Sequence, residues 1–423
     1  MLDTTRHPCF NVEAKSHSGR VHLPVAPKCN ILCNYCNRQY DCVNESRPGV
    51  TSAVLSPAQA EMYLEQVLQA EPRITVAGIA GPGDPFANSA ATLETLERIR
   101  KKFPDLLLCL ASNGLGLPEH LDTLEHIGIS HVSITVNAVD PEIGQRIYSW
   151  ARDGKVIYRG LKAAEILLAR QLTAIEGLKN RGIIVKVNTI VIPGINDHHV
   201  LEVAEKMKSL GVDLLNCMPI YPNQETPFAQ IPEPTKEQMA DLQGRAEKYL
   251  PQMRHCTRCR ADAVGLLGAD RSQELSGCLA ACSRTLPAAE QRPYVAVATL
   301  EGMLVNQHLG EAGRFQIWGQ NGGGFTLIEE RPAPPPGGGV QRWLDLANLL
   351  QDCRAVLVSA LGDTPRELLM ESGIMPIDMD GFIDRGLQAV YTGSDLTALK
   401  ARKGGLGKSC CGGGSKGPGG GCM

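Results

Sequence analysis

Three cysteines near the start of the chain are spaced to hold an iron–sulfur cluster. Cys29, Cys33 and Cys36 follow the pattern C-x3-C-x2-C. A loop this tight can wrap three thiolates around a cubic [4Fe–4S] cluster, for which cysteine thiolates are the usual ligands. Three ligands leave one of the four irons open. The spacing therefore predicts a cluster with an iron that can bind a small molecule.

The same spacing resembles the signature of the radical S-adenosylmethionine (SAM) enzymes. Tyr35 directly precedes the third cysteine, and its ring offers a flat face to the adenine of SAM. A zinc loop is the alternative, but zinc prefers four ligands in a closed tetrahedron. We therefore expect Cys29, Cys33 and Cys36 to hold the cluster that binds SAM.

The composition narrows the class of protein. The 423 residues suffice for two or three domains, and the formal net charge of −3 argues against a nucleic-acid partner bound through bulk charge. The sequence contains no run of 18 or more apolar residues, so we expect no membrane span. The first residues lack the apolar core of a signal peptide, so we expect a cytoplasmic protein. Fifteen cysteines in such a chain indicate metal ligands rather than disulfides.

Strand and helix patterns alternate from about residue 21 to residue 250. This alternation predicts parallel βαβ units, and about six of them predict an incomplete (βα)6 barrel. The long helical pattern is interrupted by a turn at Asp153-Gly154. The expected strands are 21–26, 74–79, 106–111, 132–136, 183–192 and 214–220, and the expected helices are 57–71, 90–103, 118–127, 141–180, 197–209 and 235–249.

Polar residues and glycines stand at or just past the ends of these strands. In parallel barrels, active sites are built at the C-terminal ends of the strands. Each residue alone is typical of an ordinary turn, but several in register favour a site. The candidates are Gly81, Gly83, Asp84, Ser112, Asn113, Asn137, Asn188 and Tyr221.

A cysteine-rich linker follows the predicted barrel. Cys256 and Cys259 form a C-x2-C pair, and Cys278 and Cys282 follow about 20 residues later. This spacing is also close to a zinc ribbon, so structural zinc is an open alternative.

A small α/β domain is expected after the linker. Segments 294–300 and 303–309 are predicted to form a hairpin about Glu301-Gly302, and the tail is low in complexity. The predicted organisation is a cluster-ligand segment 1–20, a barrel 21–250, a cysteine-rich cluster-binding segment 251–289, an α/β domain 290–400 and a disordered Gly-rich tail 401–423.

Longer motifs resemble the NifB family of nitrogenase iron–molybdenum cofactor biosynthesis proteins. Residues 294–400 are similar to the small ribonuclease H-like domain of NifX-type cofactor carriers, and the resemblance covers nearly the whole chain. The motifs are His22-Leu-Pro-Val-Ala-Pro-Lys-Cys29, Cys36-Asn-Arg38, Asp41 to Thr51, Ala80-Gly-Pro-Gly-Asp-Pro85 and Cys256-x2-Cys-Arg-Ala-Asp-Ala-Val-Gly265.

The resemblance implies a radical SAM enzyme that fuses two [4Fe–4S] clusters into an eight-iron cofactor precursor. A carbide derived from SAM, and an extra sulfide, enter the product. One SAM donates a methyl group, and another is cleaved, as in lyases, to a 5′-deoxyadenosyl radical that removes hydrogen from the transferred carbon. The implied partners are iron–sulfur cluster donor proteins, the nitrogenase cofactor carrier and assembly scaffold, and an electron donor such as ferredoxin or flavodoxin.

The resemblance also implies the ligands of the two precursor clusters. Cys9, His22 and Cys109 match the site of the first, and Cys256 and Cys259 match that of the second. The third ligand of the second cluster stays open among three cysteines. Cys42 is favoured over Cys278 and Cys282 because it lies in the 41–51 motif, close to the SAM-cluster loop.

Other residues are expected around the reacting groups. The Gly81–Asp84 turn lets backbone approach the methionyl end of SAM, since glycine has no Cβ. Glu45, Arg47 and Tyr221 are expected to line the reaction chamber. Glu45 acts there as an acid/base or a transient iron ligand, or else forms a salt bridge with Arg47. Hydrogen bonds to the carboxylate and ribose of SAM are expected from Ser112, Asn113, Asn137 and Asn188.

Two other functions compete with this interpretation. One is a radical SAM enzyme that uses auxiliary clusters to modify a peptide or small molecule; Cys9, His22 and the carrier-like domain have no role there. The other is a non-catalytic iron–sulfur scaffold, which needs neither the SAM loop nor the polar residues at the strand ends.

Overall fold

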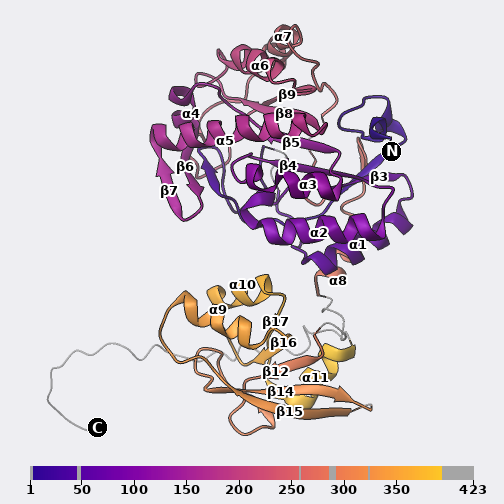
Figure 1. The fold of residues 1–423 in the computed structure, drawn as a ribbon, viewed down its shortest axis with the longest axis vertical. Coiled ribbons are helices and arrows are strands. Elements are labelled where there is room, and N and C mark those ends of the chain that lie inside the picture. The colour runs from indigo at the N-terminus through magenta and orange to yellow at the C-terminus, as the bar shows by residue number, and fades with distance from the viewer. Residues whose placement is uncertain (1–2, 45–48, 257–258, 285–291, 323, 393–423) are drawn as a thin grey trace, which may run out of the picture. The chain divides into compact units, whose positions relative to one another are not determined.

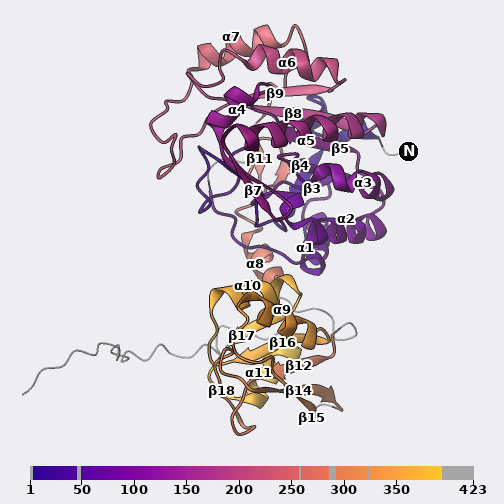
Figure 2. The ribbon, with the colours of Figure 1, turned by 60° about the vertical axis from the view of Figure 1, so that its left-hand side comes forward.

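The computed structural model describes residues 3–44, 49–256, 259–284, 292–322 and 324–392 (Figures 1 and 2). The chain divides into two compact units, Met1–Thr285 and Leu286–Met423. Each unit is described by itself. No helix of the described residues is both long and apolar enough to cross a membrane.

A curled parallel sheet forms the centre of the first unit. Within the described residues its six parallel strands run in the order β1-β3-β4-β5-β8-β9, as a partial (βα)6 barrel requires, so the predicted fold class is confirmed. The strands are β1 (Gly19–His22), β3 (Ile74–Ile79), β4 (Leu107–Ser112), β5 (His131–Thr135), β8 (Ile184–Val191) and β9 (Leu214–Pro219).

Helices cover the outer face of this sheet (Figure 1). Their apolar faces bury leucine, isoleucine and valine against the strands. Local signals start them: Ser56 and Gln59 form a capping box ahead of α1, and Pro57 occupies its first turn. The helices are α1 (Pro57–Ala70), α2 (Ser89–Lys102), α3 (Leu121–Ile127), α5 (Gly160–Asn180), α6 (Val200–Ser209) and α7 (Lys236–Ala246).

The prediction of helical segments over 141–180 is wrong between residues 148 and 159, although the predicted interruption at Asp153-Gly154 coincides with a turn. After α4 (Pro141–Ile147), the chain forms a hairpin of β6 (Tyr148–Asp153) and β7 (Val156–Arg159). Aromatic and β-branched residues favour strands here, and Gly154, with φ 59°, allows the tight turn. β6 pairs with β2 (Ile31–Cys33), so the hairpin supports the cysteine loop.

The cysteine-rich linker extends the sheet. β10 (Val264–Leu266) pairs antiparallel with β1, and β11 (Ala269–Asp270) follows it. α8 (Ser276–Arg284) then packs against α1, where the Cys278 thiol donates to Gln66 Oε1 at 2.9 Å. The segment just before β10, which carries Cys259, thereby reaches β1.

The second unit is built on another sheet, ordered β15-β14-β12-β16-β17 in the described residues. The predicted hairpin of 294–300 with 303–309 is wrong. β12 pairs instead with β14 and β16, because its side chains alternate between two buried cores. The strands are β12 (Tyr294–Val297), β14 (Arg314–Asn321), β15 (Gly324–Pro332), β16 (Cys353–Val358) and β17 (Met375–Asp378).

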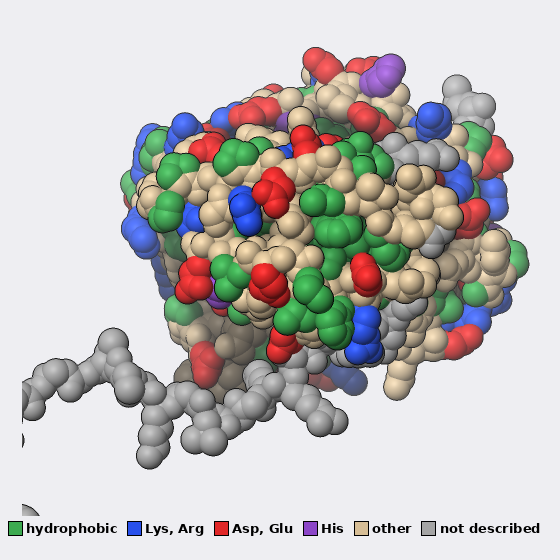
Figure 3. Space-filling model, turned by 90° about the horizontal axis from the view of Figure 1, so that it is seen from below, with side chains coloured by type: hydrophobic (Ala, Val, Ile, Leu, Met, Phe, Trp, Pro, Cys, Tyr) green, Lys and Arg blue, Asp and Glu red, His purple; other side chains and the backbone are tan. Residues whose placement is uncertain are grey.

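Helices and a short strand pair complete this unit. α9 (Val340–Leu349) and α10 (Asp363–Glu371) pack on one another, and α11 (Ile383–Thr392) contributes to a second buried core. β13 (Leu304–Val305) pairs with β18 (Gly381–Phe382) beside the exposed side chains of Met303 and Phe382. Figure 3 shows one face of the molecule on which hydrophobic side chains gather among scattered charged ones.

Candidate functional site

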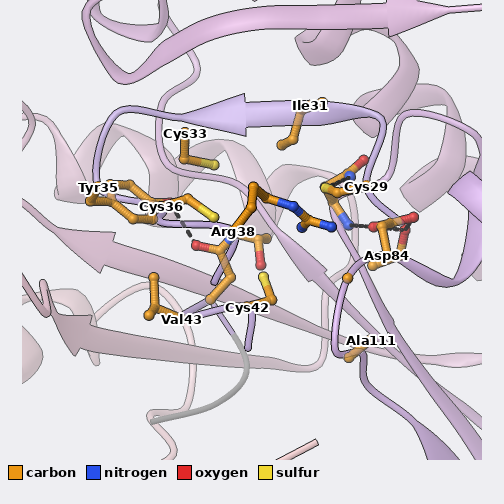
Figure 4. A pocket seen from close by; sticks show the side chains of 15 residues that line it. Cys29, Ile31, Cys33, Tyr35, Cys36, Arg38, Cys42, Val43, Asp84 and Ala111 are labelled. Carbon is orange, nitrogen blue, oxygen red and sulfur yellow. Dashed lines mark hydrogen bonds between the residues drawn. The ribbon is translucent and has the colours of Figure 1, made fainter. Parts of the chain in front are cut away.

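A first pocket lies between the cysteine loop and the C-terminal ends of β4 and β5. It encloses about 430 Å³, counting its open mouth. Figure 4 shows four cysteine side chains around this space, with Arg38 reaching into it. The lining residues are Cys29, Ile31, Cys33, Tyr35, Cys36, Arg38, Cys42, Val43, Asn44, Gly83, Asp84, Ala111, Ser112, Asn113 and Thr135.

The three loop thiols share an environment that suits metal ligation. Burial raises the pKa of Cys29 to about 12 and also raises the pKa of Cys33 and Cys36. Without metal these thiols hold their protons, and iron must displace them. No three His, Cys, Asp or Glu side chains of the described residues are grouped to hold a single metal ion. The thiolates fit a cluster, whose irons each need their own cysteine.

Asp84 organises the polar wall of this pocket. Its buried carboxylate accepts hydrogen bonds from the Asn113 backbone N–H (2.6 Å), Ser112 Oγ (3.0 Å) and the Phe86 backbone N–H (2.9 Å). Burial raises the pKa of Asp84, and these donors oppose the shift. Asn113 Nδ2 in turn lies 2.7 Å from Asn30 Oδ1 and 3.8 Å from Cys29 Sγ. The strand end of β4 is thereby tied to the cysteine loop.

The glycine turn lies close to the backbone that leads into the cysteine loop. A Cβ on Gly83 would overlap the carbonyl oxygen of Lys28. Backbone hydrogen bonds of 2.6 Å join Gly83 to Ala26 and Asp84 to Lys28. The close approach that glycine permits is therefore to the chain's own backbone, and it fixes the entry to the cysteine loop. Gly81 does not line the pocket.

Tyr35 and Asn137 act in the structure as buried supports. Tyr35 is 0% exposed, so its ring offers no open face to an adenine. Its hydroxyl donates to Asn44 Oδ1 (2.6 Å) and accepts from Asn137 Nδ2 (2.7 Å). The Ile190 backbone N–H donates to Asn137 Oδ1, so the Asn137 amide joins the loop to β8.

Cys42 lies with the loop thiols rather than with Cys256 and Cys259. Its backbone N–H donates to the Pro82 carbonyl at 2.9 Å, and burial, with the neighbouring Cys36, raises its pKa. Cys42 lines the first pocket and the C-x2-C pair lines the second, so the assignment of Cys42 to the cluster of that pair stays a prediction. The Asp41 carboxylate accepts hydrogen bonds from the backbone N–H and the hydroxyl of Thr51, and the adjacent Cys42 lines the first pocket.

A second pocket brings together cysteines from distant parts of the chain. It encloses about 610 Å³, again counting its mouth, and Ala111 lines both pockets, so they adjoin. Five further ligand candidates lie here: Cys9, His22, Cys109, Cys256 and Cys259. Its other lining residues are His7, Phe10, Arg20, Ile79, Ala80, Leu110, Ala111, Ser133, Lys186, Asn188, Asn216, Met218, Met253 and Leu267.

Strand register places His22 beside Cys109. His22 on β1 pairs with Gly78 on β3, which pairs with Cys109 on β4. The two side chains meet over the bare Gly78, where a Cβ would lie 2.6 Å from Cys109 Sγ. Parallel pairing therefore delivers a thiol and an imidazole to one face of the sheet.

The ring of His22 is oriented as a metal ligand would be. Nδ1 lies 2.9 Å from the Arg260 carbonyl, an acceptor that fixes the proton on Nδ1 and leaves the Nε2 lone pair for a metal. Burial, followed by the charge of Arg20, lowers the pKa of His22 to about 4. The imidazole is thus neutral near pH 7, as ligation requires.

Cys9 reaches the second pocket on the segment that precedes β1. Thr75 Oγ donates to the Arg6 carbonyl (3.0 Å), and His255 Nε2 lies 3.0 Å from the Pro8 carbonyl. Burial, with some contribution from Cys259, raises the pKa of Cys9 to about 12. The N-terminal segment therefore brings Cys9 near the C-x2-C pair.

The remaining candidates lie elsewhere. Asn188 lines the second pocket, not the first, and Tyr221 lines neither. Glu45 and Arg47 lie outside the described residues. Cys278 and Cys282 sit on α8 against α1, away from Cys256 and Cys259, so the zinc-ribbon pattern is not assembled.

Charged lining residues were missed in the sequence. Arg38 lies two residues beyond Cys36, so its place in the motif was a usable signal. Arg20 and Lys186 look like ordinary strand residues, and only the folded sheet brings them to the second pocket.

The comparisons agree with the class of protein that this fold and cysteine loop define. Residues 23–216 match the family model of the radical SAM superfamily, and residues 291–393 match the model described as dinitrogenase iron-molybdenum cofactor. The first unit thus carries a radical SAM domain, and the second carries a NifX-like domain.

Similarity to individual proteins extends over nearly the whole chain. The chain is 51% identical to the FeMo cofactor biosynthesis protein NifB of Chlorobaculum tepidum, over 98% of this chain and 99% of that protein. It is 41% identical to the NifB protein of Klebsiella pneumoniae, over 88% of this chain and 86% of that protein. The chain belongs to the NifB family of FeMo cofactor biosynthesis proteins, which confirms the resemblance found in the sequence.

Proposed function

We propose that this chain fuses two [4Fe–4S] clusters, with a carbide from SAM and an extra sulfide, into the eight-iron precursor of the nitrogenase cofactor. The observation that carries the proposal is the pair of adjoining pockets, each with its own sulfur ligands and both lined by Ala111. A carbon that leaves SAM in the first pocket has a short path to iron in the second.

The first pocket binds SAM. Cys29, Cys33 and Cys36 hold its cluster, which when bound supplies the electron that cleaves SAM. Asp84 fixes Ser112 and Asn113 at the strand end. The guanidinium of Arg38 reaches the same space and suits a carboxylate such as that of the methionyl group. Burial of the walls keeps water from a radical.

Two uses of SAM are proposed. One molecule donates its methyl group to the second pocket, and another yields the 5′-deoxyadenosyl radical that removes hydrogen from the transferred carbon. Both reactions start in the first pocket. Ala111 lines both pockets, and its small methyl side chain leaves room for the transferred carbon and the radical to reach the second pocket.

The second pocket holds the two substrate clusters. His22 and Cys109 lie together on the sheet, and Cys9 approaches Cys256 and Cys259. A neutral imidazole carries no charge, so it can leave iron more readily than a thiolate during fusion. Cys42 lies in the adjoining first pocket. It is proposed as a ligand of a substrate cluster only if that cluster reaches from the second pocket past Ala111 into the first.

Further parts of the proposal concern residues and partners outside the pockets. Glu45 and Arg47 follow Cys42 directly in sequence, and we assign Glu45 the acid/base role. The NifX-like unit exposes Leu300, Met303 and Phe382, which suits contact with cofactor carrier and scaffold proteins. Ferredoxin or flavodoxin, cluster donor proteins and a reducing cytoplasm complete the setting.

Iron and acid-labile sulfide per chain, measured in protein purified without oxygen, test the proposal first. About 12 irons per chain would mean three four-iron clusters, as fusion requires. About 4 irons after reconstitution would mean the SAM cluster alone, and the rival enzyme that modifies a peptide or small molecule would then be favoured.

SAM labelled in its methyl carbon tests where the carbon goes. We expect the label in the metal cluster fraction extracted from the protein. A Cys256→Ala variant is the control, since it should still cleave SAM but retain no labelled cluster. Label recovered only in a peptide or a small organic product contradicts the proposal.

Removal of the second unit tests whether it takes part in the chemistry. Both pockets lie within Met1–Thr285. A chain ending at residue 285 is therefore expected to keep SAM cleavage and cluster fusion, measured by 5′-deoxyadenosine and by product iron. Abolished fusion in a truncated chain with native helix content would contradict this expectation.

A further inference from the structure

Arg20 is a buried cation aimed at a proposed cluster ligand. The residue is 1% exposed and lies on β1, two positions before His22. Its Nη2 donates to Cys259 Sγ at 2.9 Å. Its Nη1 donates to the carbonyls of Gly265 (2.5 Å) and Leu266 (3.2 Å) on β10. The backbone of β10 therefore holds the guanidinium in one orientation, with the other nitrogen on the sulfur.

The described lining of the second pocket carries cationic side chains. Among its described lining residues Arg20 and Lys186 are cationic, and none is Asp or Glu. The carboxylate that the structure pairs with Arg20 is that of Asp270, at 3.7 Å and partly exposed. A buried guanidinium stays charged and needs a compensating anion. Arg20 therefore favours negative charge on the sulfur that it contacts.

Binding of an iron–sulfur cluster places negative charge beside Arg20, because Cys259 loses its proton when it binds iron. A cluster held by cysteine thiolates gains one further negative charge when it is reduced. Hydrogen bonds to the ligand sulfurs and nearby charge set the reduction potential. A cation acts more strongly from a buried position than from the surface, since the effective dielectric constant is lower there.

We propose that Arg20 is a positioning residue for the iron–sulfur substrate of the second pocket: it fixes Cys259 Sγ and stabilises the reduced cluster. The inference rests on the proposed function. Because Arg20 donates directly to Cys259 Sγ, its charge acts most strongly on the cluster bound through that sulfur.

Reduction potentials in the full-length, iron-loaded protein test this inference. We expect Arg20→Gln to move the potential of one cluster signal, followed by electron paramagnetic resonance during a redox titration, to a more negative value. The signal of the SAM-binding cluster should stay in place. Arg20→Lys, which keeps the charge, should restore part of the shift. Arg73→Gln is the matched control, because Arg73 is a surface arginine paired with Glu71.

Each outcome decides the matter. Unchanged potentials in Arg20→Gln, with about 12 irons in the parent protein, overturn the role of Arg20 and leave the proposed function standing. About 4 irons in the parent protein overturn both. If Arg20→Gln loses iron, recovery of that iron in Arg20→Lys supports the role of the charge. Equal loss in both variants, with native melting curves, overturns it.

Discussion

The two pockets are lined by similar side chains but are assembled differently. The first takes its cysteines from one short segment, Cys29 to Cys42, supported by the β6–β7 hairpin. The second takes Cys9 from the chain start, His22 and Cys109 from the sheet, and Cys256 and Cys259 from beyond the barrel. Local geometry therefore makes the first pocket, and strand register makes the second. We therefore expect changes in the cysteine loop to disrupt the first pocket, and changes in the sheet or in its distant partner segments to disrupt the second.

The largest effect is expected from removing one ligand in each pocket. Cys33→Ala should abolish SAM cleavage and remove about 4 of about 12 irons. Cys256→Ala should keep SAM cleavage and abolish cluster fusion. Iron analysis and 5′-deoxyadenosine formation check both variants. Loss of SAM cleavage in Cys256→Ala would mean that the pockets are not independent.

A pair of glycine substitutions probes the same contrast through the backbone. Gly83→Ala puts a Cβ onto the Lys28 carbonyl, so it should disrupt the cysteine loop and lower stability by about 1–3 kcal/mol. Gly78→Ala puts a Cβ 2.6 Å from Cys109 Sγ and should displace that thiol. We expect the first variant to lose SAM cleavage and the second to lose iron while still cleaving SAM. The reverse pattern would contradict the assignment of the pockets.

A smaller effect is expected at His22. His22→Ala should keep the SAM cluster and lose part of the remaining iron, because the imidazole is one ligand among several. His17→Ala is the control, since His17 is an exposed histidine on the same segment. Unchanged iron content would remove His22 from the ligand set.

The smallest effect is expected on the pH dependence of the free energy of unfolding, through the buried His131. Burial, then the charge of Lys186, lowers the pKa of His131 from 6.5 to about 3. Between these two pH values His131 binds a proton in the unfolded chain but not in the folded chain. The free energy of unfolding is therefore at its highest above pH 6.5 and decreases as the pH is lowered below that value. From pH 6.5 to 5.5 this costs about 1 kcal/mol. His131→Gln should lose that part of the pH dependence in denaturant titrations; an unchanged slope would contradict it.

The parts of the fold with a regular apolar period could be predicted from the sequence. Apolar periodicity located the strands of the barrel within a few residues, and the cysteine spacing located the first pocket. The strand 148–153 was missed because its apolar residues also fit a helix, and its partner Ile31–Cys33 lies far away in sequence.

The site residues that prediction misplaced depend on long-range packing. Cys42 follows the loop closely, but spacing does not say which pocket a side chain faces. Arg20 and Cys259 are separated by 239 positions and meet only through β1–β10 pairing. The sequence predicts that the Tyr35 ring faces an adenine, yet the ring is buried and its hydroxyl is hydrogen-bonded to two asparagines.

The positions of the proposed ligands along the chain also determine when, during translation, each pocket has all of its cysteines. The thiols of the SAM loop have all been made once residue 36 is added, early in translation. Those of the second pocket are complete only after Cys259, when the whole barrel has emerged. Since chains fold from the N-terminus as they leave the ribosome, Cys9 has to wait for its neighbours longer than any other ligand. Binding of iron by all the proposed ligands of the second pocket is therefore possible only after Cys259 has been made.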